Sequence, residues 1–264
     1  ISNAINSKTK AIIPMDYGGM SCKISEISEV AKKNNLILIE DAAECLGSTV
    51  KGIKVGSQSD SAIFSFCGNK VLTTGEGGAV VTNSKKIYEK IKLIRSHGRQ
   101  DSINYFKNPS KSEYLSLGYN WRMSSLTAAL GISQLKKLDK IIKMRQKNAK
   151  HLTSKLAKFK EISISDPPNG YEHIYQMFTI KLNSKKIRDS LHTFLKKKRI
   201  FTKVYFFPIH LTEFYKKNFP NSSKSLSNTE RLSNQLLTLP LYPNMTNEEK
   251  EYLIESISEF FEKR

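Results

Sequence analysis

Three stretches of this 264-residue sequence carry side chains whose types and spacing suit one kind of chemistry. Asp41 follows the apolar run at 36–39, which predicts a carboxylate at the carboxyl end of a buried strand. Such a carboxylate must be paired or must serve a ligand, because burying it alone is too costly. Lys70 follows a second apolar run at 61–66, and the segment TTGEGG occupies 73–78. A strand-end acid, a loop lysine and a glycine-rich turn therefore form one candidate set.

Pyridoxal 5′-phosphate is a cofactor that requires such a set. It needs an amine to form a Schiff base, a carboxylate to keep its pyridine nitrogen protonated, and hydroxyls and amides around its phosphate. Each member also has a simpler explanation. Asp41 could cap a helix beginning at 42–44, and a lone lysine such as Lys70 is most often a solvated surface group.

Other site chemistries find no support in the sequence. There is no GxxxxGK[ST] loop and no GxGxxG after a strand, and the five histidines lack HExxH spacing, so no metal site is expected. The three cysteines have no CxxC spacing and are expected to be buried, reduced thiols. No apolar run approaches the length of a spanning helix and the first residues do not form a signal peptide. We expect a soluble, cytoplasmic protein without a membrane partner.

The net charge is strongly positive, with 43 Lys plus Arg against 24 Asp plus Glu and a formal charge of +19. The basic residues are mainly scattered lysines, whereas nucleic-acid readers concentrate arginine and aromatic residues on one face. We therefore expect no nucleic-acid partner and attribute the charge to compositional bias or to a pocket for anionic ligands. Binding to nucleic acid stays as the last-ranked hypothesis.

Hydrophobic periodicity predicts an α/β fold with two parts. The large part, 1–149, is expected to contain a mostly parallel sheet whose strands are joined by crossover helices. The smaller part, 150–264, is expected to be an α+β domain. The strands are predicted at 11–15, 36–39, 61–66, 79–82, 175–180 and 200–205, and the helices at 24–33, from 83 to 94, from 124 toward 159, at 185–197 and at 247–261.

Several motifs of the chain occur together in one known family. The sequence reads EDAAE at 40–44, FSFCGNK at 64–70, GEGG at 75–78 and GYNWRM at 118–123, followed by PIH at 208–210 and LPLYP at 239–243. These resemble the EDAA(Q/E/H), FSFxxxK…GEGG, GYNYRM, PLH and LPxyP motifs of the DegT/DnrJ/EryC1/StrS sugar aminotransferases. The resemblance covers the whole chain and implies the large and small domains of a fold type I pyridoxal-phosphate enzyme.

The resemblance assigns roles to individual residues. It implies that Lys70 forms the Schiff base with the cofactor and then moves a proton between the substrate carbon and the cofactor. Asp41 would pair with the pyridinium nitrogen, and Ser65 would bind the phosphate. Glu44 would lie near the 3′ oxygen of the cofactor, where the family more often has Gln or His. Asn120 would reach a phosphate in the neighbouring subunit, which implies a homodimer.

The implied reaction is amination of a nucleotide-linked 4-keto-6-deoxysugar to the 4-amino sugar, with glutamate as donor, for a cell-surface polysaccharide precursor. The form GNK…TTGEGG favours the GDP-perosamine branch of the family, and His210 is a candidate for the substrate side. Two alternatives stay open. One is an aminotransferase acting on a UDP- or dTDP-linked keto sugar, and the other is a non-catalytic binding or regulatory homologue.

One departure from the family concerns the beginning of the chain. Family members carry roughly a hundred further residues before the position of residues 7–11, about the size of part of a domain. In the family that segment supplies a Gly-Thr-(Ala/Ser) turn for the phosphate and an aromatic ring that stacks on the cofactor. Without it we expect an exposed part of the sheet and poor independent stability. Either the native protein is longer or a partner chain supplies the segment.

Overall fold

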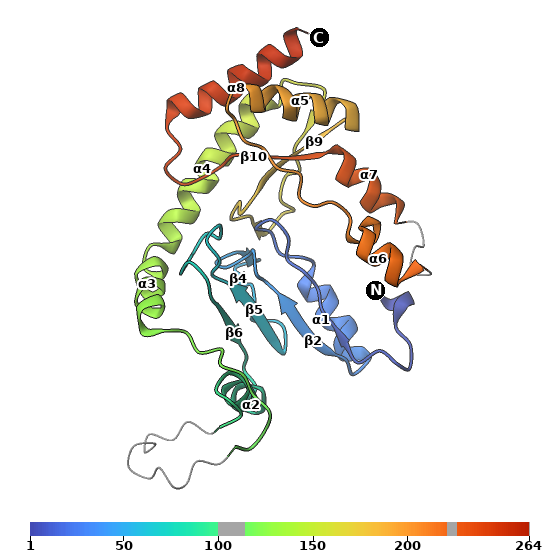
Figure 1. Cartoon of the computed structure of the whole chain (residues 1–264), viewed down its shortest axis with the longest axis vertical. Helices are drawn as coiled ribbons and strands as arrows, with labels where there is room; N and C mark the ends of the chain where they lie inside the picture. The colour runs from blue at the N-terminus through green and yellow to red at the C-terminus, as the bar shows by residue number, and fades with distance from the viewer. Residues whose placement is uncertain (100–113, 221–225, 264) are drawn as a thin grey trace. The chain divides into compact units, whose positions relative to one another are not determined.

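The computed structural model of the chain describes residues 1–99, 114–220 and 226–263 (Figure 1). Within them the chain forms two compact units. The first comprises residues 1–140 and 169–176, and the second comprises residues 141–168 and 177–264. The boundary predicted at residue 150 lies inside helix α4 (Leu138–Leu156), and the domain assignment stays a prediction.

The first unit is built on a four-stranded sheet in the order β1-β2-β5-β6. Its first three strands are parallel and β6 is antiparallel to β5, so the mostly parallel sheet is confirmed. Helix α1 (Ile24–Lys33) connects β1 to β2, as predicted. The strands are β1 (Ala11–Ile12), β2 (Ile37–Asp41), β5 (Ser61–Ser65) and β6 (Gly78–Val81).

The connection from β2 to β5 differs from the predicted crossover helix. It consists of turns and a hairpin formed by β3 (Thr49–Val50) and β4 (Ile53–Lys54). Strand β8 (Tyr171–Glu172) adds to β3 from a segment more than a hundred residues later in the chain. The polar and glycine-rich stretch after residue 45 favours turns over a helix, because glycine tolerates the positive φ angles that these turns use.

The two faces of the main sheet differ in burial. Alternate side chains point to opposite faces, and Leu38, Ala62 and Phe64 are buried on one of them, with Leu38 and Phe64 in two apolar clusters. On the other face Ile37 and Ile63 are 52% and 38% exposed. In the described part of the chain this second face therefore keeps an apolar surface without a covering layer, as the sequence leads us to expect.

Three further helices begin or lie in the first unit. Helix α2 (Lys85–Arg95) and helix α3 (Ser125–Leu135) start at Ser84 and Ser124, whose side chains accept a backbone N–H. The single helix predicted from 124 toward 159 is wrong, because it breaks into α3 and α4. At Lys137 the backbone N–H bonds to the carbonyl of Gln134, three residues back, so the α-helical pattern stops and restarts at Leu138.

The second unit is an antiparallel sheet of order β10-β9-β7 covered by helices, which agrees with the predicted α+β texture. Helices α5 (Lys185–Lys197) and α8 (Asn247–Glu262) have nearly the predicted bounds. They pack on each other. The remaining elements of this unit are β7 (Ile162–Ser163), β9 (Phe178–Leu182), β10 (Leu236–Leu239), α6 (Glu213–Asn218), α7 (Ser227–Gln235) and a short 3-10 helix, Ile209–Leu211. The first unit begins with another short 3-10 helix, Ser2–Ala4.

Two predicted strands of this region need correction. The strand predicted at 175–180 begins only at Phe178, because residues 175–176 belong to the first unit. The strand predicted at 200–205 is wrong, since Lys203 makes one isolated bridge to Thr238 and no ladder. A run of apolar and aromatic residues does not form a strand unless a neighbouring strand offers its backbone groups.

Three features concern membrane spans, metal sites and the cysteines of the described residues. No helix among them combines the length and apolar character needed to cross a membrane. The same part of the chain contains no group of three or more His, Cys, Asp or Glu placed to hold a metal. The three cysteines are free, with Cys45 buried and Cys22 and Cys67 half-buried.

Candidate active site

Lys70 and Glu44 form an ion pair at the carboxyl end of the main sheet. Lys70 lies in the loop after β5, and its Nζ is 3.1 Å from Oε1 of Glu44. The two side chains are only 14% and 10% exposed, so the pair is largely shielded from water. Oε2 of Glu44 accepts a hydrogen bond of 2.9 Å from the backbone N–H of Gly18. The structure thus brings together two of the predicted site residues and removes the surface explanation for Lys70.

Asp41 ends strand β2, as predicted, and is half-buried. Its Oδ1 accepts the backbone N–H of Ala43 at 3.1 Å. Residues 42–46 form turns, so the alternative in which Asp41 caps a helix is wrong. Its backbone is held on the opposite side, where its carbonyl accepts the N–H of Asp16 at 2.9 Å. The acid is therefore fixed at the strand end by short local contacts.

Ser65 shares a sheet face with Asp41. Asp41 pairs with Ile63 across the β2–β5 ladder, and Ser65 lies two residues after Ile63, so both side chains are on the uncovered face. Oγ of Ser65 accepts the N–H of Cys67 at 3.3 Å. An acid and a hydroxyl thus project from neighbouring strands at their carboxyl ends, where ligands bind in open α/β sheets.

The glycine-rich segment closes the loop that carries Lys70. Phe66 donates its N–H to the carbonyl of Gly77 and accepts the N–H of Thr74, each at 2.9 Å. Gly77 has a φ of +147°, and a Cβ there would lie 2.7 Å from Oγ1 of Thr74. The hydroxyl of Thr74 donates to the carbonyl of Glu76 at 2.7 Å. The glycine is required by this closed geometry.

The sequence analysis missed Gln176. Its side chain is buried, its Oε1 accepts the N–H of Val71 at 3.0 Å, and its Nε2 donates to the carbonyl of Asn69 at 2.7 Å. Both partners are the immediate neighbours of Lys70. No motif spacing could have revealed this contact, because more than a hundred residues separate Gln176 from the loop.

A buried pair of carboxyl groups behind Asp41 was also missed. Asp16 and Glu40 are fully buried, and the charge of Asp16 acts on the carboxyl group of Glu40. Oε2 of Glu40 accepts from the N–H of Gly56 and the hydroxyl of Ser59, each at 3.0 Å. Burial and the neighbouring charge of Asp16 raise the pKa of Glu40 to about 7, and burial likewise raises the pKa of Asp16.

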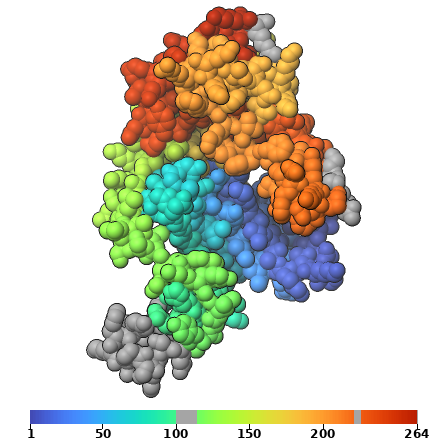
Figure 2. All heavy atoms as spheres, viewed as in Figure 1, coloured from blue at the N-terminus to red at the C-terminus, as the bar shows by residue number. Residues whose placement is uncertain are grey.

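Asn120 lies on an exposed segment of the first unit. Its Oδ1 accepts from Nε and Nη2 of Arg122 at 3.3 and 3.2 Å. The neighbouring rings of Tyr119 and Trp121 are stacked, with centroids 4.1 Å apart, and the Trp121 side chain is 65% exposed. This part of the chain, coloured green, forms an outer surface in Figure 2. Nothing in the single chain tests the reach of Asn120 toward a partner, which stays a prediction.

His210 belongs to the second unit, unlike the other predicted site residues. Its Nε2 lies 3.1 Å from Oε1 of Glu230, and the side chain is largely buried. A His paired to a carboxylate in this way has a structural explanation within its own unit. Its predicted role toward the substrate stays a prediction.

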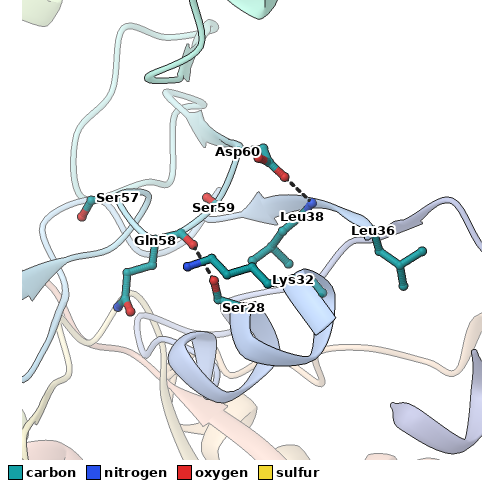
Figure 3. Close-up of a pocket in the computed structure, with 9 residues that line it drawn as sticks. Ser28, Lys32, Leu36, Leu38, Ser57, Gln58, Ser59 and Asp60 are labelled. Carbon is teal, nitrogen blue, oxygen red and sulfur yellow. Dashed lines mark hydrogen bonds between the residues drawn. The ribbon is translucent and has the colours of Figure 1, made fainter. Parts of the chain in front are cut away.

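A cavity of about 440 Å³ lies away from these groups (Figure 3). It opens between α1 and the segment that precedes β5, with Lys32, Leu36 and Asp60 among its lining residues. Asp60 accepts the N–H of Leu38 there, and Ser28 donates to the carbonyl of Gln58. These contacts explain its polar residues, and the cavity contains none of the predicted site residues.

The groups at the carboxyl end of the sheet fit pyridoxal phosphate by their chemistry. Lys70 supplies a shielded amine, Asp41 a carboxylate, and Ser65 a hydroxyl next to a glycine-rich loop. All three belong to the first unit, and two of them share the uncovered face of the sheet. Their common role as a cofactor site stays a prediction.

Comparisons with known proteins identify the family of the chain. The model of the DegT/DnrJ/EryC1/StrS aminotransferase family matches residues 1–258. The chain is 34% identical over 265 residues to GDP-perosamine synthase of Escherichia coli O157:H7, covering 99% of this chain and 68% of that protein. It is 36% identical over 257 residues to UDP-4-amino-4,6-dideoxy-N-acetyl-beta-L-altrosamine transaminase of Campylobacter jejuni, covering 96% of this chain and 66% of the transaminase.

A solved aminotransferase structure is similar to the chain over its whole length. Helicobacter pylori PseC, an aminotransferase of pseudaminic acid biosynthesis, superposes with a TM-score of 0.92 at 29% identity, covering 100% of this chain and 70% of the PseC chain. The predicted fold type I architecture is confirmed by this likeness. The chain spans about two thirds of the length of the curated relatives it matches.

Proposed function

Because this chain belongs to the DegT/DnrJ/EryC1/StrS aminotransferase family, as its motifs predict, we propose that it transfers an amino group to a nucleotide-linked keto sugar with pyridoxal phosphate as cofactor. Aminotransferases of this family use that cofactor, and solved relatives have been seen in its pyridoxal and pyridoxamine forms. The observation that carries the proposal is the shielded Lys70–Glu44 pair, in the same unit as the strand-end carboxylate of Asp41.

In this proposal each site residue has a separate role in the reaction. When bound, the cofactor supplies an electron sink for the carbon that gains or loses the amino group. Nζ of Lys70 would hold the cofactor, and the free amine would move the proton at the substrate carbon. Glu44 holds Nζ of Lys70 in place. The Asp41 carboxylate would keep the pyridine nitrogen of the cofactor protonated, and the Ser65 hydroxyl would bind its phosphate.

The proposed substrate is a GDP-linked 4-keto-6-deoxysugar, which is converted to its 4-amino form with glutamate as donor. The support is the GNK…TTGEGG form of the lysine loop together with the likeness to GDP-perosamine synthase. The product would serve as a cell-surface polysaccharide precursor. A UDP-linked keto sugar is the second candidate, because the Campylobacter jejuni transaminase is at least as similar in sequence.

We also propose that the working protein is a cytoplasmic homodimer. The support is the exposed segment around Asn120, where Trp121 presents an apolar side chain to the surface. Asn120 would then complete the phosphate site of the partner. The non-catalytic alternative is disfavoured by the shielded Lys70–Glu44 pair, since a protein that only binds sugar has no use for a poised amine.

The test is covalent capture of the cofactor. The chain is mixed with pyridoxal phosphate, its visible spectrum is recorded, and the mixture is reduced with borohydride before peptide mapping. We expect modification concentrated on Lys70, abolished in Lys70→Ala and unchanged in Lys54→Ala, a lysine exposed on β4 of the same unit. Modification spread over surface lysines without preference for Lys70 would contradict the proposal. Keto-sugar assays with GDP and UDP substrates then separate the two candidates.

A further inference from the structure

Gln176 forms hydrogen bonds with the backbone on both sides of Lys70. The N–H of Val71 donates to its Oε1 at 3.0 Å, and its Nε2 donates to the carbonyl of Asn69 at 2.7 Å. A single amide side chain thus satisfies one donor and one acceptor of the peptide groups that flank the lysine. Because Gln176 is 9% exposed, these bonds compete little with water.

Gln176 itself is held by the segment that precedes it. In that segment Glu172 pairs with Thr49 on β3, and the N–H of Ile174 donates to the carbonyl of Gly19 at 2.9 Å. The N–H of Tyr175 donates to Nδ1 of His173 at 2.8 Å, and the two rings stack with centroids 4.1 Å apart. These contacts fix the turn that presents the Gln176 side chain to the lysine loop.

The same segment touches the turn that holds Glu44. Gly19 has a φ of +107°, and a Cβ on it would lie 2.6 Å from the backbone nitrogen of Gln176. The neighbouring Gly18 donates its N–H to Oε2 of Glu44, whose Oε1 bonds Nζ of Lys70. The contacts therefore form a closed ring that runs from the tip of Lys70 through Glu44, the 18–19 turn and the 174–176 segment back to the Lys70 backbone.

We infer that Gln176 is a positioning residue for Lys70. Glu44 restrains the amine, and Gln176 restrains the peptide groups from which the side chain starts, so the ring fixes both ends of the lysine. All members of the ring lie in the first unit. The functional meaning rests on the proposed function, in which Lys70 must leave the cofactor and return to it. A fixed backbone lets Nζ make that short movement without losing its place.

The inference can be tested without cofactor or substrate. Competitive acetylation at a series of times, followed by mass spectrometry, gives the relative reactivity of each lysine in the folded chain. In Gln176→Met, which has a similar length and no hydrogen-bonding amide, the loop should loosen and the Lys70 amine should become more accessible. We expect its labelling rate to rise by about threefold to tenfold, the change that corresponds to losing about one net hydrogen bond. Labelling of the exposed Lys54 should stay constant.

Two further variants separate positioning from general destabilisation. Gln176→Glu keeps an acceptor for the N–H of Val71 and loses the donor to Asn69, so its Lys70 rate should be intermediate. Ile24→Val removes one methyl group from the apolar cluster formed with Ala31 and Leu38, and should lower the unfolding temperature without raising the Lys70 rate. An unchanged rate in Gln176→Met, or an equal rise in Ile24→Val, would overturn the inference.

Failure of the inference and failure of the proposed function give different results. If Lys70 of the unmodified chain does not capture pyridoxal phosphate but its acetylation responds to Gln176→Met, the proposed function fails and the positioning role stands. If Lys70 captures the cofactor and its acetylation ignores Gln176→Met, the positioning role fails alone. Measuring the borohydride capture yield on the same variants shows whether a change in Lys70 acetylation is accompanied by a change in cofactor capture.

Discussion

Nζ of Lys70 lies 3.1 Å from Oε1 of Glu44, and the second oxygen of that carboxylate is held by the N–H of Gly18. The amine proposed to hold the cofactor is therefore paired with a carboxylate that is itself held by a backbone N–H. Both charged groups are shielded from water. Removal of either one would therefore leave the other buried without a compensating charge.

Replacement of Glu44 should depend strongly on the new side chain. Glu44→Ala leaves the Lys70 ammonium shielded without an anion and the Gly18 N–H without an acceptor, which should cost about 3 kcal/mol of unfolding free energy. Glu44→Gln keeps an acceptor for only one of these two donors, because its second polar atom is an NH2 group, and should cost about 2 kcal/mol. Urea unfolding measures both. Equal losses in the two variants would show that hydrogen bonding to this side chain contributes nothing.

Substitution of Gly19 should disturb the lysine site from a distance along the chain. Gly19→Ala places a Cβ 2.6 Å from the backbone nitrogen of Gln176 at a φ of +107°, so backbone atoms must move. We expect a loss of about 3 kcal/mol and faster acetylation of Lys70. Gly52→Ala is the matched control, because its φ is also positive and nothing lies within 4 Å of the new Cβ. It should cost about 1 kcal/mol and leave Lys70 labelling unchanged.

The buried carboxyl groups of Asp16 and Glu40 predict a pH effect on stability. The pKa of Glu40 is raised to about 7 in the folded chain, so the folded state binds a proton more tightly than the unfolded state. The contribution of Glu40 is complete below pH 4.5, falls as the pH rises, and is lost above about pH 7. Glu40→Gln, which mimics the protonated form, should flatten this slope. Thermal unfolding at several pH values checks it, with the exposed Glu29→Gln as control.

His173 should produce the opposite slope at lower pH. Burial lowers the pKa of His173 to about 4, and its Nδ1 accepts the N–H of Tyr175, which requires the unprotonated nitrogen. Its contribution is complete above about pH 6.5 and is lost as the pH falls toward 4, because the unfolded state takes up the proton first. His173→Asn can still accept that N–H and should reduce the loss. A variant with the unaltered acid slope would contradict this explanation.

Mixed dimers test the proposed reach of Asn120 into the partner site. Lys70→Ala and Asn120→Ala subunits should each bind the cofactor poorly when alone. If each site takes Lys70 from one subunit and Asn120 from the other, a hybrid dimer contains one intact site. Statistical mixing of a symmetric dimer should then restore about a quarter of the sites. Borohydride capture yield measures them, and no recovery in verified hybrids would place Asn120 in the site of its own subunit.

Local patterns in the sequence were sufficient for much of the fold. The helices at 24–33, 185–197 and 247–261 follow from a 3.6-residue period, and the strands carrying Asp41 and Ser65 follow from short apolar runs. These signals come from neighbouring residues. The strand predicted at 200–205 failed for the same reason, because a ladder needs a partner strand that the local sequence does not contain.

The amino-acid sequence by itself determined the chemical inventory of the site and the family of the chain, since the motifs around Asp41 and Lys70 are short and local. Only the tertiary structure decided which contacts position these residues. The hydrogen bonds of Gln176 to the peptide groups beside Lys70, and the burial of Asp16 with Glu40, involve residues distant in sequence. Such contacts depend on which backbone segments the folded core brings within hydrogen-bonding distance, and no spacing rule along the chain encodes that distance.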